Sequence, residues 1–356
     1  MNLKKIILPI SIIGLLGFTS YLLAGKKRTS NNTQASTTDA DMQKVLDAMA
    51  SFNGKPITQL TPEQARLQAS PADAVLKVLK EEGKSTAPQQ VASVKEITIP
   101  GPYGDIPAHV FTPYGAGPFP VIVYFHGGGF VIASTKVYEA SVRGLANGAE
   151  AIVVAVDYHL APEHKYPTQA DEAYAAYAWV LKHAAELNGD AKRVAVAGES
   201  AGGNLATVVS LMARDKQAPL PVHQLLVYPV VDKEMRNASY IQHVNAKPLN
   251  RPMMEWFFKH YVRNINDAEH AYALPNKAKS LTGLPSTTLI TAEIDPLYTE
   301  GKAFAERLKS DNVPVAYQHY AGVTHEFFGM AAVVSKAKDA QAFASAELKK
   351  AFAAVK

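Results

Sequence analysis

The segment Gly198-Glu199-Ser200-Ala201-Gly202 joins an apolar run to an amphipathic helical pattern. The apolar run covers residues 193–197, and apolar residues recur at helical spacing after Gly202. A strand, a sharp turn and a helix in this order predict a nucleophile elbow, with Ser200 at a strained, positive φ. Gly198 and Gly202 fit this geometry because the strand and the helix pass too close for side chains. An ordinary turn serine is the alternative that this motif alone leaves open.

A second glycine motif, His126-Gly127-Gly128-Gly129-Phe130, follows another buried-strand pattern at residues 119–125. Consecutive glycines leave backbone amides unshielded, and such amides form part of the oxyanion hole in acyl-transfer enzymes. A flexible loop or a phosphate cradle is the alternative, but the lysine and hydroxyl residue of a phosphate-binding loop are absent. The two motifs together predict a serine hydrolase in which His126 anchors the glycine loop.

These motifs resemble the hormone-sensitive-lipase-like family of α/β-hydrolase esterases. The resemblance extends from about residue 40 to the C-terminus and also rests on Tyr158–Pro167, Asp295-Pro296-Leu297 and Gly322–Phe327. It implies the α/β-hydrolase fold and a helical cap over the active site. His159 stands where the family often has arginine, Glu326 where it often has glycine, and Thr299 where an acid is common.

Apolar strand-like runs alternate with helical patterns along most of the chain. This alternation predicts a mostly parallel sheet with helices on both faces. We expect residues 41–356 to form the α/β-hydrolase domain, with about 41–90 and 232–284 contributing the cap. The expected strands are 94–99, 106–112, 120–125, 151–156, 193–197, 223–228, 287–292 and 314–319. The expected helices are 41–52, 62–82, 168–187, 201–214, 298–310 and 337–353.

A serine nucleophile needs a base and an orienting carboxylate, and in α/β-hydrolases both follow the serine along the chain. Asp295 comes after the strand pattern at 287–291, at the sheet edge where such sites form. Glu293 is the rival acid, and the resemblance selects Asp295. His325 follows strand 314–319 by a short loop, whereas His319 within that strand is the weaker candidate.

The remaining site expectations concern the oxyanion and the substrate pocket. We expect the amides of Gly127, Gly128 and Ala201 to form the oxyanion hole. Four bulky side chains are candidates for the pocket wall, with core packing as the alternative: Phe130, Trp256, Phe257 and Phe327.

Composition narrows the partners and cofactors. The chain has no cysteine and no H-E-x-x-H pattern, so we expect neither a metal nor an organic cofactor. The formal charge is +4, but residues 1–28 carry five Lys and Arg side chains and no acid. The rest of the chain therefore has no basic excess, and nucleic-acid binding has no compositional support.

The N-terminus carries a targeting signal. Residues 6–24 contain no charge and lie between lysine pairs, and a run of this length can span a bilayer as a helix. We therefore expect residues 1–28 to be an uncleaved signal-anchor, with 29–40 as a tether and the catalytic body outside the cytoplasm. A cleaved signal peptide that releases a periplasmic or secreted enzyme is the alternative.

The function that these features predict is hydrolysis of carboxylic esters through a Ser-His-Asp triad and an acyl-enzyme. We expect small-molecule esters with short-to-medium acyl chains as substrates. The alternatives are a catalytically silent small-molecule receptor of the same fold, or an amide or lactone hydrolase. The oligomeric state is not indicated.

Overall fold

A computed structural model describes residues 37–355, which contain an eight-stranded sheet in the order β1-β2-β4-β3-β5-β6-β7-β8. Strands β1 and β2 are antiparallel to their neighbours, and every other adjacent pair is parallel. The strands are β1 (Ser93–Gly101), β2 (Gly104–Thr112), β3 (Phe119–Phe125), β4 (Ile152–Val156), β5 (Gly189–Glu199), β6 (Gln224–Val227), β7 (Thr287–Ile294) and β8 (Val315–Thr324). The expected α/β-hydrolase fold with a mostly parallel sheet is confirmed.

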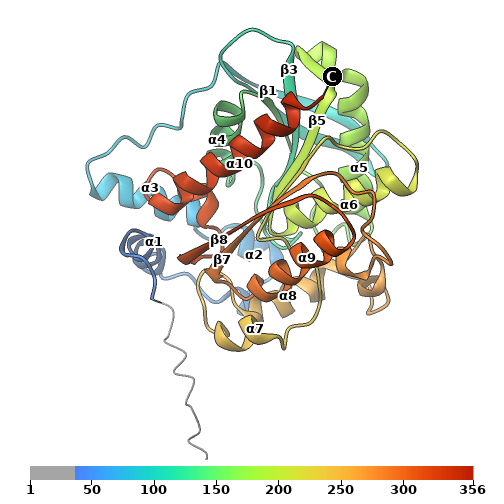
Figure 1. The fold of residues 1–356 in the computed structure, drawn as a ribbon. Coiled ribbons are helices and arrows are strands. Elements are labelled where there is room, and N and C mark those ends of the chain that lie inside the picture. The colour runs from blue at the N-terminus through green and yellow to red at the C-terminus, as the bar shows by residue number, and fades with distance from the viewer. Residues whose placement is uncertain (1–36, 356) are drawn as a thin grey trace, which may run out of the picture. The chain divides into compact units, whose positions relative to one another are not determined.

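Helices cover both faces of this sheet (Figure 1). The helices are α1 (Ala40–Ala50), α2 (Pro62–Arg66), α3 (Pro71–Glu81), α4 (Glu139–Ala149), α5 (Thr168–His183), α6 (Ala201–Asp215), α7 (Ala238–Gln242), α8 (Arg251–Tyr261), α9 (Tyr298–Ser310) and α10 (Ser335–Ala353). Short 3₁₀ helices include η1 (Ile57–Gln59) and η5 (Phe327–Met330).

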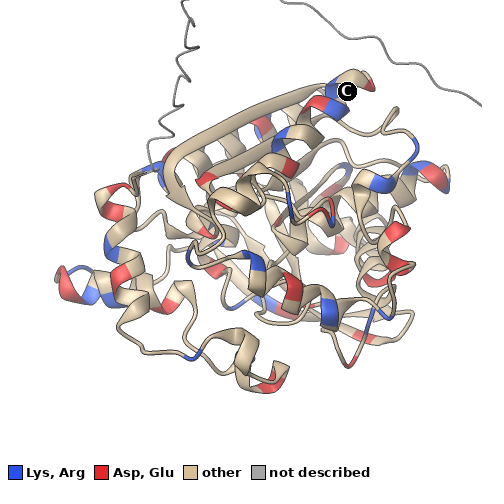
Figure 2. Ribbon diagram, turned by 90° about the horizontal axis from the view of Figure 1, so that it is seen from below, with Lys and Arg blue, Asp and Glu red and all other residues tan. Residues whose placement is uncertain are grey.

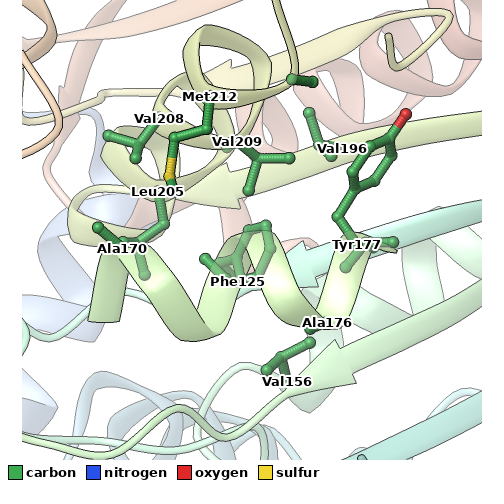
Figure 3. Close-up of a cluster of buried hydrophobic side chains, with 14 of the residues drawn as sticks. Phe125, Val156, Ala170, Ala176, Tyr177, Val196, Leu205, Val208, Val209 and Met212 are labelled. Carbon is green, nitrogen blue, oxygen red and sulfur yellow. The ribbon is translucent and has the colours of Figure 1, made fainter. Parts of the chain in front are cut away.

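The alternation of side chains along the central strands divides the core into two layers. Val121, Val123 and Phe125 of β3 pack with apolar side chains of α5, α6 and α9, whereas Ile122 and Tyr124 pack with those of α1, α3, α4 and α10. Successive residues of a strand point to opposite faces, so a strand that is apolar at every position is buried on both sides. Figure 3 shows part of the first layer, where side chains of α5 and α6 meet those of the strands.

All eight expected strands are present, and the main differences from the expectation concern the end of β8, the helix expected over 62–82, and α4. Strand β8 continues to Thr324, so the expected loop between residue 319 and His325 is strand. The helix expected over 62–82 is two helices, because Ser70 caps α3 and Pro71 occupies its first turn. Helix α4 was not expected from the sequence.

The described part of the chain contains no helix that is long and apolar enough to cross a membrane. Residues 6–24, on which the membrane expectation rests, lie outside the described residues.

Candidate active site

Ser200 lies on a sharp turn between the end of β5 and the start of α6. Its φ of 56° and ψ of −116° confirm the positive φ expected for a nucleophile elbow. A Cβ atom at Gly202 would lie 1.9 Å from the carbonyl oxygen of Phe125, and one at Gly198 would lie 2.2 Å from Gly202. The chain crosses itself too closely here for any side chain, and the elbow keeps the Ser200 hydroxyl in place.

His325 lies between Ser200 and Asp295. Its Nε2 is 3.0 Å from Ser200 Oγ, and its Nδ1 is 2.7 Å from Asp295 Oδ2. The other Asp295 oxygen accepts a 2.9 Å hydrogen bond from the Leu297 amide, which fixes the carboxylate. Ser200, Asp295 and His325 each directly follow or adjoin the carboxyl end of a parallel strand, so the fold brings them to one edge of the sheet.

The rival side chains lie elsewhere. Glu293 accepts a 2.7 Å hydrogen bond from the Gly322 amide, and His319 contacts Thr291 at 3.1 Å while its ring packs on Tyr298. The structure thus pairs His325 with Asp295 rather than with Glu293.

The imidazole of His325 is almost entirely buried beside the cavity, and its surroundings change its proton affinity. Burial lowers the pKa, but the charge and hydrogen bond of Asp295, followed by the charges of Glu326 and Glu199, raise it above its usual value overall. The neighbouring acids therefore favour the protonated ring, the form that appears when a base takes the serine proton.

The glycine loop is anchored at His126. The ring of His126 stacks on Tyr158, with centroids 4.4 Å apart, and its carbonyl accepts a 2.8 Å hydrogen bond from the Tyr158 hydroxyl. Burial lowers the pKa of His126, despite the opposing charge of Asp157. These contacts agree with an anchoring position for His126.

The amides of Gly127 and Gly128 have no hydrogen-bond acceptor among the described residues. A Cβ atom at Gly127 would lie 2.3 Å from the Tyr138 hydroxyl, and one at Gly128 would lie 2.3 Å from the Ile132 carbonyl oxygen. Ala201 begins α6, where amides lack partners within the helix. All three expected oxyanion donors thus belong to backbone segments with amides free to bind a ligand.

A buried acid, Glu199, and a partly buried acid, Glu326, adjoin the serine and the histidine together with three tyrosines that no sequence pattern connects to them. Glu199 accepts a 2.6 Å hydrogen bond from Tyr124 and another from Tyr228. Glu326 accepts a 2.7 Å hydrogen bond from Tyr138. Burial, followed by the charge of Glu326, raises the pKa of Glu199 to about 7. The acids are neighbours of Ser200 and His325 in the sequence, but their tyrosine partners come from distant segments without any shared pattern.

A cavity of about 550 Å³ opens onto Ser200, His325 and Glu326. Its lining includes residues 46–71 and 247–257, which belong to the two segments expected to form a cap. Most of the wall is apolar, with side chains from α1, η1 and α8: Leu46, Met49, Ile57, Met253, Met254 and Phe257. This size and lining are typical of small-molecule sites.

Arg66 of α2 ties the N-terminal helices to the loops beside the cavity. Its guanidinium donates hydrogen bonds of 2.8 Å to the carbonyl oxygens of Val131 and Ala161, and it forms a two-point ion pair with Glu163 at 2.8 and 2.7 Å. A planar guanidinium is suited to such simultaneous contacts.

Only Phe257 of the four expected pocket side chains lines the cavity. Phe130 stacks on Tyr261 at 3.8 Å, Trp256 packs on Phe257 and His260, and Phe327 is fully buried beside Tyr228. The expectation is corrected for Phe130, Trp256 and Phe327, because each packs on neighbouring rings and none of them lines the cavity.

The described residues contain no group of three or more His, Cys, Asp and Glu side chains arranged to hold a metal. Lys and Arg are interspersed with Asp and Glu along the ribbon in Figure 2.

Known proteins share both the sequence and the fold. A model of the alpha/beta hydrolase fold family matches residues 122–329. Carboxylesterase NlhH of Mycobacterium tuberculosis is 39% identical over 251 residues, which cover 69% of this chain and 79% of that enzyme. Ethyl acetate hydrolase of Pseudomonas putida is 30% identical over 288 residues, covering 80% of this chain and 88% of its own. A solved esterase structure from Pyrobaculum calidifontis superposes with a TM-score of 0.79 at 34% identity, covering 90% of this chain and 100% of that one.

A serine on a strained turn at the carboxyl edge of a parallel sheet, with a histidine and an acid beside it, defines an α/β-hydrolase. The similar proteins described above are carboxylesterases and esterases, which identifies the family within this class. The chain belongs to the hormone-sensitive-lipase-like family of α/β-hydrolase esterases, and it is a carboxylic ester hydrolase.

Proposed function

We propose that Ser200, His325 and Asp295 form the catalytic triad of this esterase, with the Gly127, Gly128 and Ala201 amides as its oxyanion hole. The observation that carries the proposal is the position of His325, within hydrogen-bonding distance of both Ser200 and Asp295 beside an apolar cavity. A base that is oriented by a buried carboxylate is what a serine nucleophile requires.

In acylation, the Ser200 oxygen attacks the ester carbonyl while His325 Nε2 takes the serine proton. Asp295 stabilises the resulting imidazolium and keeps Nε2 facing the serine. The three backbone amides stabilise the oxyanion. The alcohol then leaves with the proton from His325, and the acyl group remains on Ser200.

In deacylation, water attacks the acyl-enzyme and gives its proton to His325 Nε2. The carbon–oxygen bond to Ser200 breaks, the serine oxygen recovers the proton, and the carboxylic acid leaves. Neither half of the cycle uses a metal or an organic cofactor.

The substrate class is a small ester with a short-to-medium acyl chain. The apolar lining favours the acyl group by about 0.8 kcal/mol for each buried methylene. A cavity of about 550 Å³, bounded by the two cap segments, limits how many methylenes gain this energy. Activity thus rises with chain length, reaches a maximum and then falls.

A fluorophosphonate probe and a nitrophenyl ester series test this proposal directly. We expect residues 29–356 to be labelled and to hydrolyse acetate through medium-chain esters, and Ser200→Ala to lose both properties. A catalytically silent receptor would show neither labelling nor turnover in the unsubstituted protein. Parallel assays on an anilide and a lactone distinguish the amide and lactone alternatives.

The proposal extends to the location of the enzyme in the cell, which we assign to its N-terminal segment. The uncharged run 6–24 and its basic flanks support a membrane anchor with the catalytic body outside the cytoplasm. We expect the full-length chain in the membrane fraction and a chain starting at residue 29 in the soluble fraction. An exported soluble form beginning near residue 25 favours cleavage instead, and recovery of the full-length chain wholly in the cytosol contradicts both forms.

A further inference from the structure

Glu326 places a second carboxylate on the catalytic side of His325. Its Oε1 is 3.8 Å from His325 Nε2, the atom that also faces Ser200 Oγ at 3.0 Å. Glu326 lines the cavity, and 18% of its side chain is exposed. Asp295 serves the opposite ring nitrogen, so Glu326 has no part in orienting the imidazole through Nδ1.

Tyr138 holds this carboxylate in position. The Tyr138 hydroxyl donates a 2.7 Å hydrogen bond to Glu326 Oε1, and it lies 2.3 Å from where a Cβ atom on Gly127 of the glycine loop would be. Glu326 Oε2 has no hydrogen-bond partner among the described residues. A carboxylate has about four acceptor positions, so this group retains capacity for a further donor from the cavity.

The backbone at Glu326 favours glycine rather than glutamate. Its φ is 70°, in the left-handed region where a side chain costs roughly 1 kcal/mol or more. Strained non-glycine residues cluster at functional sites, so the backbone strain at Glu326 indicates a function for its side chain.

We propose that Glu326 positions the water molecule that hydrolyses the acyl-enzyme. Once Ser200 carries the acyl group, Nε2 is free to accept a new donor, and one water reaches both Nε2 and Glu326 across the 3.8 Å gap. One O–H of the water points at Nε2 and the other at the Glu326 carboxylate, which directs the oxygen lone pair toward the acyl carbon. The proposal rests on the triad assigned above and adds a residue specific to deacylation.

The protons balance without any change in Glu326. The water oxygen bonds to the acyl carbon, its first proton goes to Nε2 and then to the departing Ser200 oxygen, and its second proton stays on the product acid. An alcohol acceptor such as methanol has a single O–H, which Nε2 takes, so it has nothing to donate to Glu326. Glu326 therefore favours water over alcohol as the acyl acceptor.

The experiment measures how the acyl-enzyme divides between water and methanol. With a nitrophenyl ester in aqueous methanol, Glu326→Gly is expected to raise the ratio of methyl ester to free acid by about tenfold, the effect of losing one hydrogen bond to a charged group. Steady-state kcat without methanol falls by a similar factor, and a nitrophenolate burst appears while the acylation rate stays within about twofold. The product ratio does not depend on how much enzyme is folded.

Matched variants separate this role from others. Glu326→Gln keeps an acceptor oxygen without the charge and is expected to raise the ratio less than Glu326→Gly does. Tyr138→Phe, which leaves the carboxylate without its donor, is also expected to give an intermediate ratio. Glu150→Gly makes the same substitution at an exposed residue with φ 51° and should leave the ratio unchanged. An equal loss of acylation and deacylation with an unchanged ratio would assign Glu326 to imidazolium stabilisation and overturn the proposal. The triad fails separately, if Ser200→Ala still turns over.

Discussion

The ring of Tyr228 lies against the imidazole of His325, with centroids 4.4 Å apart, while its hydroxyl donates a hydrogen bond to Glu199. A single side chain therefore contacts the proposed base and binds the acid that precedes the nucleophile. Tyr124 of β3 binds the other oxygen of Glu199, so the acid is held by one residue within β3 and by another that directly follows β6. We therefore expect proton binding by Glu199 to change both the free energy of unfolding and the pKa of His325.

Glu199→Gln is expected to stabilise the protein above neutral pH. The pKa of Glu199 is about 7 in the folded chain, against 4.5 when exposed, so its contribution to stability is present below about pH 4.5 and is lost as the pH rises to 7. The variant removes this loss, which is on the order of 1–3 kcal/mol. Urea unfolding at pH 5 and pH 8, with exposed Glu96→Gln as the control, measures the difference. If the free energy of unfolding changed equally between pH 5 and pH 8 in the Glu199 variant and in the parent enzyme, the expectation would be contradicted.

The acid limb of the pH profile is expected to lie above about 6.5, the ordinary histidine value. His325 acts as a base only when neutral, and its surroundings raise its pKa despite burial, through Asp295 first and then Glu326 and Glu199. Activity is therefore lost as the pH falls through that raised value. Glu326→Gln removes one negative charge and should move the limb of kcat/KM to lower pH. An unmoved limb would show that Glu326 is not charged in the free enzyme.

Substitutions in the triad are expected to be severe and non-additive. Ser200→Ala, His325→Ala and Asp295→Asn should each lower kcat by about 10³-fold or more, and pairs should cost little beyond the worse single change. His319→Ala is the matched control, because His319 lies within β8, which His325 directly follows, and its ring packs on Tyr298. Near-native kcat in His325→Ala together with loss in His319→Ala would reassign the base.

Phe257→Ala is expected to move the preferred acyl chain to greater length. The ring lines the cavity and lies where a Cβ atom on Gly129 would be, so its removal extends the apolar space. Each additional methylene that fits should raise kcat/KM by about fourfold. Trp256→Ala on the same helix is the control, since Trp256 does not line the cavity. Identical chain-length profiles for both variants would exclude Phe257 from the acyl wall.

Gly202→Ala is expected to abolish the folded enzyme. The new methyl group would lie 1.9 Å from the Phe125 carbonyl oxygen, and neither α6 nor β3 can retreat from the crossing. The cost should exceed about 4 kcal/mol. Gly83 has the opposite properties: its φ is 65°, in the left-handed region, but a Cβ atom there would have no atom within 4 Å, so Gly83→Ala is expected to cost only about 1 kcal/mol. Thermal unfolding of both variants measures the contrast.

The sheet was predictable from the sequence, because strands buried on both faces are apolar at nearly every position. Helix α4 was not, although its glycines have a physical purpose. Cβ atoms at Gly144 and Gly148 would lie 2.2 Å from the Gln341 side chain and 2.3 Å from Ser345 Oγ, so the glycines let α10 pack closely on α4. Residues that weaken a helix in isolation thus serve a contact with a distant segment.

The meeting of Ser200, Asp295 and His325 was predictable for a different reason. Each follows a parallel strand, and parallel strands end at one edge of a sheet, so their order along the chain also places them in space. The directions of Phe130, Trp256 and Phe327 were not predictable, because an aromatic side chain next to a site has equal reason to face the core. The tyrosine partners of Glu199 and Glu326 depend on contacts between segments far apart in the sequence.

The contacts of Arg66 limit how the cap can be exchanged among related esterases. It fastens α2 to two backbone carbonyl oxygens and to Glu163, all of which belong to the catalytic body. The carbonyl oxygens of Val131 and Ala161 remain in the body, whichever cap is joined to it. A chimera whose cap lacks an arginine at this position leaves both carbonyl oxygens and the Glu163 carboxylate without their donor. We therefore expect exchanged caps to fold onto the body only when they include this arginine.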